Sequence, residues 1–220
     1  MEERAKNLLI NLEERLKFFS QLGIDFLSSS SESKTSVFHD LNKRILNCQK
    51  CDLSQERKNA VPGEGNLEAE LMFVGEAPGY DEDIQGQPFV GKAGKLLTKI
   101  INAMNFQRQD VYITNVVKCR PPQNRNPYRN EIDQCKHYLL EQIEKINPAV
   151  IVALGKVATD FFISSDKGMT ILRGNFHDFN NIRVMPTFHP SYLIRNEGNR
   201  EIRKMVWEDM KKVMAFLSKK

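Results

Sequence analysis

The sequence of 220 residues lacks any apolar run long enough to span a bilayer. No signal peptide fits its start, because residues 1–19 are charged throughout and contain no uninterrupted apolar stretch. We therefore expect a cytoplasmic protein that does not bind membranes. Cysteine is scarce, with four residues in the chain. In a reducing compartment such thiols are more often metal ligands than disulfides.

Several common catalytic motifs are absent as well. The sequence contains no P-loop, no G-x-S-x-G and no H-E-x-x-H, which are the usual signatures of nucleotide-binding, serine-hydrolase and metalloprotease sites. No internal repeat is visible. The net charge of +4 is only mildly basic, so it permits binding to a polyanion without arguing for it.

What is present predicts one globular domain with an N-terminal extension. The chain is 40% hydrophobic and 27% charged, and it is long enough to bury a full core. Apolar residues recur at helical spacing over 3–22, and SSSSESKTS (28–36) is typical of a polar linker. We predict a helix and linker over 1–36 and the domain over 37–220.

Strands and helices alternate through this domain. Short apolar runs typical of buried strands lie at 71–75, 111–117, 149–155 and 182–188. Helical patterns fill the other segments: a short helix before Cys48, then 92–104, 129–146, a helix ending near 163, and 199–217. The alternation predicts an α/β fold of three layers (α/β/α) around a central, mainly parallel sheet of four strands.

The segments that follow these strands carry the most unusual polar residues. They are GEAPGYDED (75–83), KCRPPQNRNP (118–127), LGK (154–156) and HPSYLIR (189–195). In open α/β sheets, ligands bind beyond the carboxyl ends of the strands. We therefore predict that these segments converge on one rim, and that the functional site lies there.

The four cysteines have a spacing typical of a four-thiolate site. Cys48 and Cys51 form a C-x-x-C pair, Cys119 ends the second predicted strand, and Cys135 lies in a predicted helix. Zinc and a [4Fe–4S] cluster both accept four thiolates. Zinc ribbons generally use two C-x-x-C pairs, so this spacing favours a cluster and leaves zinc as the alternative. Four unrelated buried thiols are the simplest other explanation.

Four side chains of the predicted rim are candidates for acting on a ligand, although each has an ordinary structural explanation too. Glu76 follows a strand in what could be a simple turn, and Phe89 in its glycine-flanked loop could be core or a stacking surface for a base. A buried Asn115 needs hydrogen-bond partners and can offer a donor and an acceptor to a base edge. His189 could be a helix cap or a catalytic group.

Arginines surround the predicted rim. They are Arg120, Arg125 and Arg129 after the second strand, and Arg195, Arg200 and Arg203 after the fourth. Cations beside an aromatic ring and an amide suit a nucleobase carried on a nucleic acid.

Four motifs and the cysteines resemble the family 4 uracil-DNA glycosylases, which are iron–sulfur enzymes of the uracil-DNA glycosylase superfamily. The motifs are GEAPGYDED, GQPFVGKAGKLL, YITNVVKCRPPQNRNP and HPSYLIR, and the resemblance runs from about Cys48 to the C-terminus. It implies a base excision repair enzyme that flips uracil out of single- or double-stranded DNA and hydrolyses its N-glycosidic bond, leaving an abasic site. It also implies a [4Fe–4S] cluster on Cys48, Cys51, Cys119 and Cys135.

The resemblance assigns roles to the rim residues. Uracil would stack on Phe89, Asn115 would hydrogen-bond its Watson–Crick edge, and His189 would stabilise the charge that builds on O2. Glu76 would hold the attacking water, and the remaining predicted substrate-binding residues are Ala77 and Pro78. The HPSYLIR segment would enter the duplex, with Leu193 as the first candidate for the wedge and Tyr192 as the second. The other predicted DNA contacts are Arg120, Arg125, Ser191 and Arg195.

Two departures from the family 1 pattern leave the water-activating group open. Ala77 stands where that family has an aspartate, so Glu76 is the first candidate and Glu82 or Asp83 the next. Gly79 stands where that family places a tyrosine against the methyl group of thymine, and Glu82 is a candidate for excluding thymine instead.

Two alternatives concern the type of activity. The covalent-trapping branch of the superfamily carries an inserted loop with a histidine, and residues 90–110 lack one, which favours a hydrolytic enzyme. A non-catalytic, metal-containing nucleic-acid-binding module of a polymerase or repair complex is the alternative to an enzyme. We further expect a monomer, and a replication or repair partner for the N-terminal helix.

Overall fold

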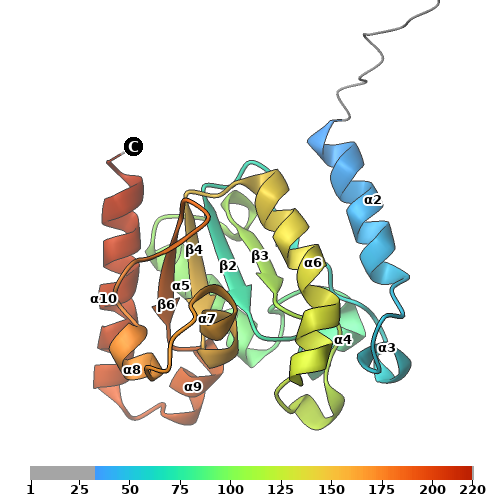
Figure 1. Cartoon of the computed structure of the whole chain (residues 1–220). Coiled ribbons are helices and arrows are strands. Elements are labelled where there is room, and N and C mark those ends of the chain that lie inside the picture. Colours follow the sequence, from blue (N-terminus) through green and yellow to red (C-terminus); the bar gives the residue numbers. More distant parts are fainter. Residues whose placement is uncertain (1–32, 220) are drawn as a thin grey trace, which may run out of the picture. The chain divides into compact units, whose positions relative to one another are not determined.

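Six strands form one sheet in the described part of the chain, which comprises residues 33–219 of the computed structural model. Residues from Phe38 onward form one compact unit (Figure 1). The strands lie in the order β1-β3-β2-β4-β6-β5. The predicted helix over 3–22 lies outside the described residues, and the domain boundary after residue 36 stays a prediction.

The four central strands are those predicted from the sequence, and they are parallel. They are β3 (Tyr112–Asn115), β2 (Leu71–Gly75), β4 (Val150–Leu154) and β6 (Ile182–Thr187). Two short antiparallel edge strands, β1 (Glu64–Gly65) and β5 (His177–Phe179), add to the four that we expected. The sheet is therefore mixed, with a parallel centre.

Helices cover both faces of this sheet, as a three-layer fold requires. Alternate residues of β2 face opposite ways: Met72 and Val74 pack in one core cluster, and Leu71 and Phe73 in the other. The first face is covered by α6 (Arg129–Ile146) and α7 (Lys156–Phe162), with α2 (Lys34–Leu46) and α3 (Leu53–Glu56) beside them. The second face is covered by α5 (Lys92–Ala103) and α10 (Arg200–Leu217).

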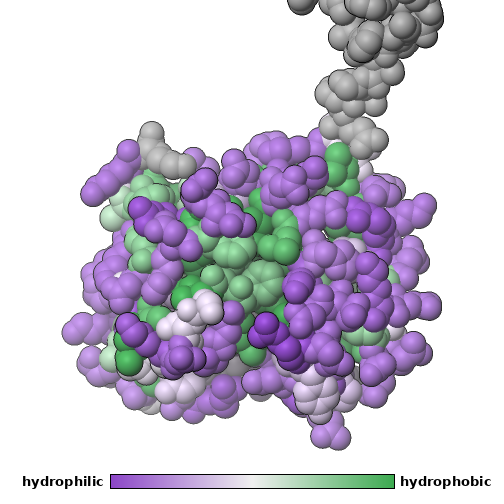
Figure 2. Space-filling view, in the orientation of Figure 1, coloured by the Kyte–Doolittle hydropathy of each residue, from purple (hydrophilic) through white to green (hydrophobic). Residues whose placement is uncertain are grey.

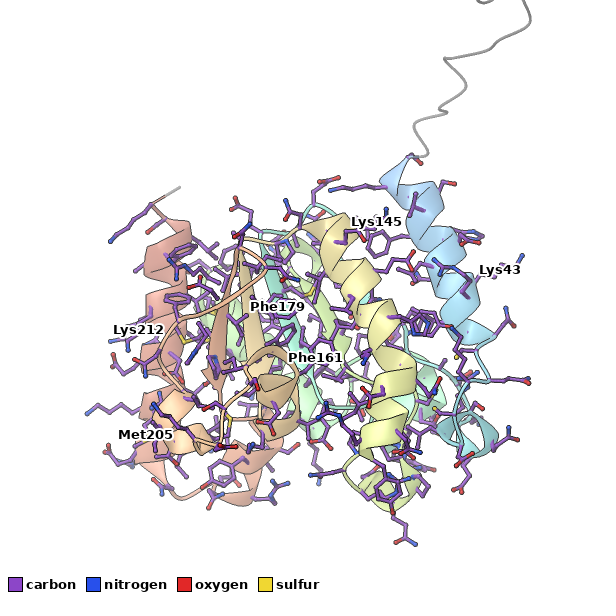
Figure 3. The ribbon with its side chains drawn as sticks, in the orientation of Figure 1. Lys43, Lys145, Phe161, Phe179, Met205 and Lys212 are labelled. Carbon is purple, nitrogen blue, oxygen red and sulfur yellow. The ribbon has the colours of Figure 1, made fainter. Side chains whose placement is uncertain are left out.

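The first core cluster reaches the surface at β5. Phe161 and Phe179, labelled in Figure 3, pack against this cluster while partly exposed. Figure 2 shows apolar side chains gathered in the middle of the same face, surrounded by hydrophilic ones. None of the helices in residues 33–219 has the length and apolar content that crossing a membrane needs.

Short helices follow the carboxyl ends of the central strands. They are α4 (Tyr80–Gln85), the 3-10 turn η2 (Pro122–Asn124) and α9 (Pro190–Arg195); η1 (Arg108–Asp110) and α8 (Met169–Leu172) lie between other elements. The sequence predicted loops in these places. In α9, Pro190 occupies the first turn, where its missing N–H costs nothing, and His189 caps the helix. These elements build the rim at the end of the parallel sheet.

Candidate active site

A cleft of about 670 Å³ opens at the carboxyl ends of the central strands. All four segments that follow these strands contribute to it, as predicted. The expected residues that line it are Glu76, Ala77, Pro78, Glu82, Phe89, Asn115, Arg125, His189, Ser191, Tyr192 and Arg195. Arg120 and Leu193 do not line it. Asn124, Lys156 and Phe188 line it without having been predicted.

Phe89 and Asn115 meet over a glycine on the inner wall. A Cβ atom on Gly75, the last residue of β2, would lie 2.4 Å from Asn115 Oδ1 and 2.5 Å from Phe89 Cζ. The backbone of Phe89 has a positive φ of 52°, which is uncommon for a residue other than glycine. A Cβ on Gly94 would lie 1.8 Å from the Phe89 carbonyl oxygen, so α5 can press directly against this loop. The two glycines therefore allow an aromatic ring and an amide to share one wall.

Asn115 is a buried amide with an unsatisfied acceptor. Its side chain is 1% exposed, and Oδ1 has no hydrogen-bond partner within the described part of the chain. A buried polar atom without a partner is costly. An acceptor left open beside an aromatic ring suits a ligand that brings its own N–H group.

His189 lies close to Phe89 on the wall formed by β6 and α9. The centroids of the two rings are 5.7 Å apart. The backbone N–H of Ser191 donates to His189 Nδ1 at 3.1 Å, so in the neutral ring the proton sits on Nε2. Burial and the nearby charge of Arg195 lower the pKa of His189 to about 4. At neutral pH the site therefore holds a neutral histidine with an N–H donor.

Glu76 is the carboxylate of the cleft without a structural task. It follows β2 directly and lines the cleft. Burial raises the pKa of its carboxyl group above the ordinary value. No hydrogen bond or ion pair of its side chain is found among residues 33–219. It is therefore available to hold a water molecule.

The two alternative carboxylates, Glu82 and Asp83, accept hydrogen bonds from backbone N–H groups of nearby loops. Glu82 accepts hydrogen bonds from the backbone N–H groups of Gly79, Val90 and Gly91 at 3.1, 2.8 and 2.9 Å. Buried Asp83 accepts from the N–H groups of Lys58 and Asn59. Because the oxygens of both side chains hold loops, the structure favours Glu76 over Glu82 and Asp83 as the water-activating group, and the choice stays a prediction.

Two of the three arginines that follow β3, Arg120 and Arg125, lie over aromatic rings, whereas Arg129 pairs with Asp133. The Arg120 guanidinium lies 5.0 Å from the centroid of the Tyr80 ring, and that of Arg125 lies 3.7 Å from the centroid of Tyr128. Arg125 also donates to both carboxylate oxygens of Glu131, at 2.9 and 2.7 Å. Its charge is therefore offset locally, which weakens the predicted role of Arg125 as a phosphate contact.

The α9 segment places its two wedge candidates differently. Leu193 is 4% exposed and packs with Ile202 and Val206. Tyr192 is 37% exposed, lines the cleft and lies against Phe188. Leu193 would have to leave this core cluster to enter a duplex, which favours Tyr192 as the wedge residue; the assignment stays a prediction.

The four cysteines lie in one neighbourhood at the outer side of the rim. Cys119 and Cys135 belong to the first core cluster, and Cys48 and Cys51 pack against it. Among residues 33–219, no group of three or more Cys, His, Asp or Glu side chains has the geometry of a site for a metal ion. Arg57 donates from Nη1 to Cys119 Sγ at 2.8 Å and from Nη2 to the carbonyl oxygen of Cys48 at 2.7 Å.

A buried lysine connects this neighbourhood to the cleft. Lys118 is 1% exposed, and its ammonium group donates to Thr114 Oγ1, the carbonyl oxygen of Asn115 and Gln142 Oε1 at 2.7, 2.8 and 2.7 Å. Its backbone N–H points to Cys135 Sγ at 3.3 Å. Burial lowers the pKa of Lys118 to about 7. Lys118 was not predicted as a functional residue, although a lysine inside the apolar run VVKC is an unusual feature.

Known proteins align with most of this chain. A family model described as the Uracil DNA glycosylase superfamily matches residues 62–211. A protein described as a type-4 uracil-DNA glycosylase from Thermotoga maritima is 50% identical over 189 residues, covering 85% of this chain and 98% of the relative. Similar proteins of the same description come from Saccharolobus solfataricus (49% identical, 80% of this chain, 84% of the relative) and Archaeoglobus fulgidus (42% identical, 82% of this chain, 94% of the relative).

Proposed function

The chain belongs to the uracil DNA glycosylase superfamily and is a uracil-excising DNA repair glycosylase, and on this premise we propose how its residues bind uracil and cleave its bond to the sugar. The observation that carries the proposal is the convergence of Glu76, Phe89, Asn115 and His189 in one cleft. The four residues come from different strand ends, and their side chains supply complementary chemistry.

Asn115 reads the flipped base while Phe89 stacks on it. Uracil carries an N–H at N3 beside a carbonyl at C4, so it can donate to the open Oδ1 of Asn115 and accept from Nδ2. Cytosine has an acceptor at N3 and an amino donor at C4, so its pattern of donor and acceptor is the opposite of that of uracil. A site with buried polar groups rejects such a ligand strongly, because its own groups would stay unpaired.

His189 stabilises the leaving base. When the bond between N1 and C1′ breaks, the bonding electron pair stays on uracil and negative charge builds on O2. A neutral imidazole with its proton on Nε2 can donate a hydrogen bond there, and Nδ1 is occupied by the Ser191 N–H. A well-placed donor of this kind contributes about 3–4 kcal/mol to the transition state.

Glu76 orients the attacking water. The oxygen of the water adds to C1′ of the deoxyribose, one proton is released, and uracil leaves as an anion that is later protonated. An ionised Glu76 holds this water and offsets the positive charge that develops on the sugar. Glu82 and Asp83 support the loops around it. Exclusion of thymine by Glu82 stays a prediction.

A [4Fe–4S] cluster on Cys48, Cys51, Cys119 and Cys135 is the second part of the proposal. The donor set fits four thiolates around a negatively charged group, because Arg57 donates to one sulfur and the buried ammonium of Lys118 lies nearby. Lys118 has no carboxylate partner in the described chain, so a bound anionic cluster would offset its charge. The cluster would supply a structural cross-link. A brown, iron-containing protein supports it, and a colourless zinc protein contradicts it.

Contacts to the DNA around the flipped base are proposed for Ser191, Tyr192 and Arg195, which line the cleft, and for Arg120, which does not. Tyr192 takes the wedge position because it is exposed beside the cleft. The proposals of a monomer and of a partner bound by residues 3–22 come from the sequence alone. Four reduced cysteines fit a reducing compartment such as the cytoplasm.

Release of free uracil from DNA tests the catalytic assignment. The iron-loaded protein is incubated with single-stranded and duplex oligonucleotides that contain one uracil, and uracil and alkali-labile sites are measured. We expect Asn115→Ala and His189→Ala to lower the single-turnover rate about 100-fold or more. Trp207→Ala, on α10 outside the cleft, is the control. Binding without uracil release would instead support the non-catalytic module.

A further inference from the structure

The exposed tyrosines of the chain lie in, or directly after, the segments that follow the central strands. The sequence contains five tyrosines, of which Tyr112 and Tyr138 are buried. The other three are Tyr80 (58% exposed), Tyr128 (59%) and Tyr192 (37%). Tyr192 lies on α9, whereas Tyr80 and Tyr128 follow β2 and β3, which are neighbours in the sheet. Two rings on one side of the base pocket therefore lie open to solvent.

These two rings are held by a continuous set of contacts, which we call the tyrosine ridge: Tyr80, Arg120, Asn124, Arg125 and Tyr128. Arg120 lies over the Tyr80 ring and donates from Nε to Asn124 Oδ1 at 2.8 Å. Arg125 follows directly in the chain and lies over the Tyr128 ring. Asn124 and Arg125 line the cleft, so the ridge continues into it.

The ridge is stiff before any ligand arrives. Pro121 and Pro122 restrict the backbone that leads into it. The carboxylate of Glu131 holds Arg125 through both oxygens and accepts from the Tyr128 backbone N–H at 2.6 Å. An aromatic ring fixed in this way loses little conformational freedom when a flat ligand stacks on it.

We infer that the tyrosine ridge binds the unpaired nucleotides next to the flipped uracil, and that it serves single-stranded DNA; this inference rests on the proposed function. Exposed aromatic rings interleaved with cations are the usual means of holding single strands, because every base has a face to stack. In a duplex the flanking bases stay paired and stacked on their outer neighbours, and the one face that flipping uncovers points into the gap that the wedge enters. The ridge therefore adds affinity for unpaired DNA only, whereas α9 with Tyr192 meets a duplex.

The charges of the tyrosine ridge suit the binding of single-stranded DNA. Arg120 has no carboxylate partner in the part of the chain that the structure describes, so its guanidinium can meet a phosphate. Arg125 is offset by Glu131 and acts as a support for the Tyr128 ring. A strand laid along the ridge thus finds two rings and one uncompensated cation beside the base pocket.

Removing each ring tests the inference. Tyr80→Ala and Tyr128→Ala are compared with the wild type on one sequence, either single-stranded or as a duplex with uracil opposite guanine. We expect kcat/KM on the single strand to fall about tenfold for each variant, in line with the loss of one base stack, and to change less than about twofold on the duplex. Tyr80→Phe and Tyr128→Phe keep the ring and should retain wild-type values. Trp207→Ala is the control for an exposed aromatic side chain elsewhere.

Abasic spacers separate stacking from phosphate binding. A tetrahydrofuran spacer replaces the nucleotide on the 5′ or the 3′ side of uracil, which removes the base and keeps the phosphates. If a tyrosine stacks on that base, its alanine substitution causes no further loss on the spacer substrate. Equal losses with and without the base, or equal losses on single strand and duplex, overturn the inference. A wild type that releases no uracil from any substrate would instead overturn the proposed function.

Discussion

Three carboxylates of one short segment have different environments, and this decides their roles. Glu82 and Asp83 accept backbone N–H groups, whereas Glu76 faces the cleft with a pKa raised by burial. The sequence placed all three near the rim. It could not tell them apart, because their partners at Lys58, Asn59 and Val90 come from other loops.

The pH dependence of activity should follow Glu76. The group must be ionised to hold the water, so activity falls as the pH drops through its raised pKa. Titration of His189 should not add a second fall in activity there, because its pKa of about 4 leaves the imidazole neutral at higher pH. We expect kcat/KM of the wild type to show an acid limb above the ordinary Glu range. In Glu76→Gln the limb should disappear and the rate fall about 100-fold or more.

Single-turnover rates across the pH range, with circular dichroism to verify folding at each pH, provide the measurement. An acid limb that persists unchanged in Glu76→Gln would assign the titration to another group. His189→Ala is the informative comparison, since it should lower the rate at every pH and leave the acid limb in place.

Burial also explains why the structure favours Tyr192 as the wedge residue, whereas the sequence favoured Leu193. Leu193 and Tyr192 are neighbours in a segment that predicted exposure for both. The structure buries Leu193 because Ile202 and Val206 of α10 close over it. Such a contact between separate helices gives no signal in the local sequence pattern. The position of the HPSYLIR segment directly after a strand, by contrast, could be predicted.

At the scale of elements, the loop that carries Phe89 depends on two glycines. Gly94 allows α5 to touch the Phe89 backbone, and Gly75 leaves room for the ring and for Asn115. Neither requires a positive φ, so an alanine would be accepted by its own backbone. The cost of substitution lies in what the new methyl group would displace.

Gly75→Ala should inactivate the cleft while the sheet persists. Its Cβ would need to push aside the Phe89 ring and the Asn115 amide, which lie at 2.5 and 2.4 Å. A misplacement of about 1 Å can cost about 100-fold in rate, and overpacking of this kind costs about 1–3 kcal/mol of stability. We therefore expect kcat/KM to fall about 100-fold with a decrease in Tm of several degrees.

Gly198→Ala is the matched control, because a Cβ there meets nothing within 4 Å. It should retain both activity and Tm. Gly75→Ala with wild-type kcat/KM would show that neither Phe89 nor Asn115 must hold its present position.

The extent of the sheet shows what local patterns can predict. The runs LMFVG, VYITNVV, AVIVALG and IRVMPTF predicted β2, β3, β4 and β6, because buried parallel strands are continuously apolar. The edge strands β1 and β5 have two and three residues, too few for a periodic signal, and they form by pairing with β3 and β6. The predicted β3 run extended to residue 117, whereas the strand ends at Asn115.

At the scale of the whole described unit, the cysteines and Arg57 join distant segments. Arg57 lies after α3, and its hydrogen bonds reach Leu46, Cys48 and Cys119, the last being 62 positions away. Lys118, next to Cys119, reaches back to the Asn115 carbonyl oxygen. These hydrogen bonds of Lys118 and Arg57 thus connect the end of β3, which carries the cleft residue Asn115, to the cysteine neighbourhood.

Arg57→Gln should loosen this connection. It removes a guanidinium that donates to a sulfur and two carbonyl oxygens, two of these bonds being partly buried and one exposed. A hydrogen bond of a charged group contributes about 1.5–3 kcal/mol, and solvent reduces the contribution of the exposed one. For a domain of this size we expect Tm to fall by about 5–10 °C. Hydrogen exchange should speed up in residues 46–57 and 115–119, and occupancy of the proposed cluster, measured as iron content, should fall. Arg183→Gln removes an exposed ion pair with Asp178 and should change Tm little, because such pairs contribute about 0–1 kcal/mol. Unchanged exchange at residues 115–119 would show that β3 keeps its end without Arg57.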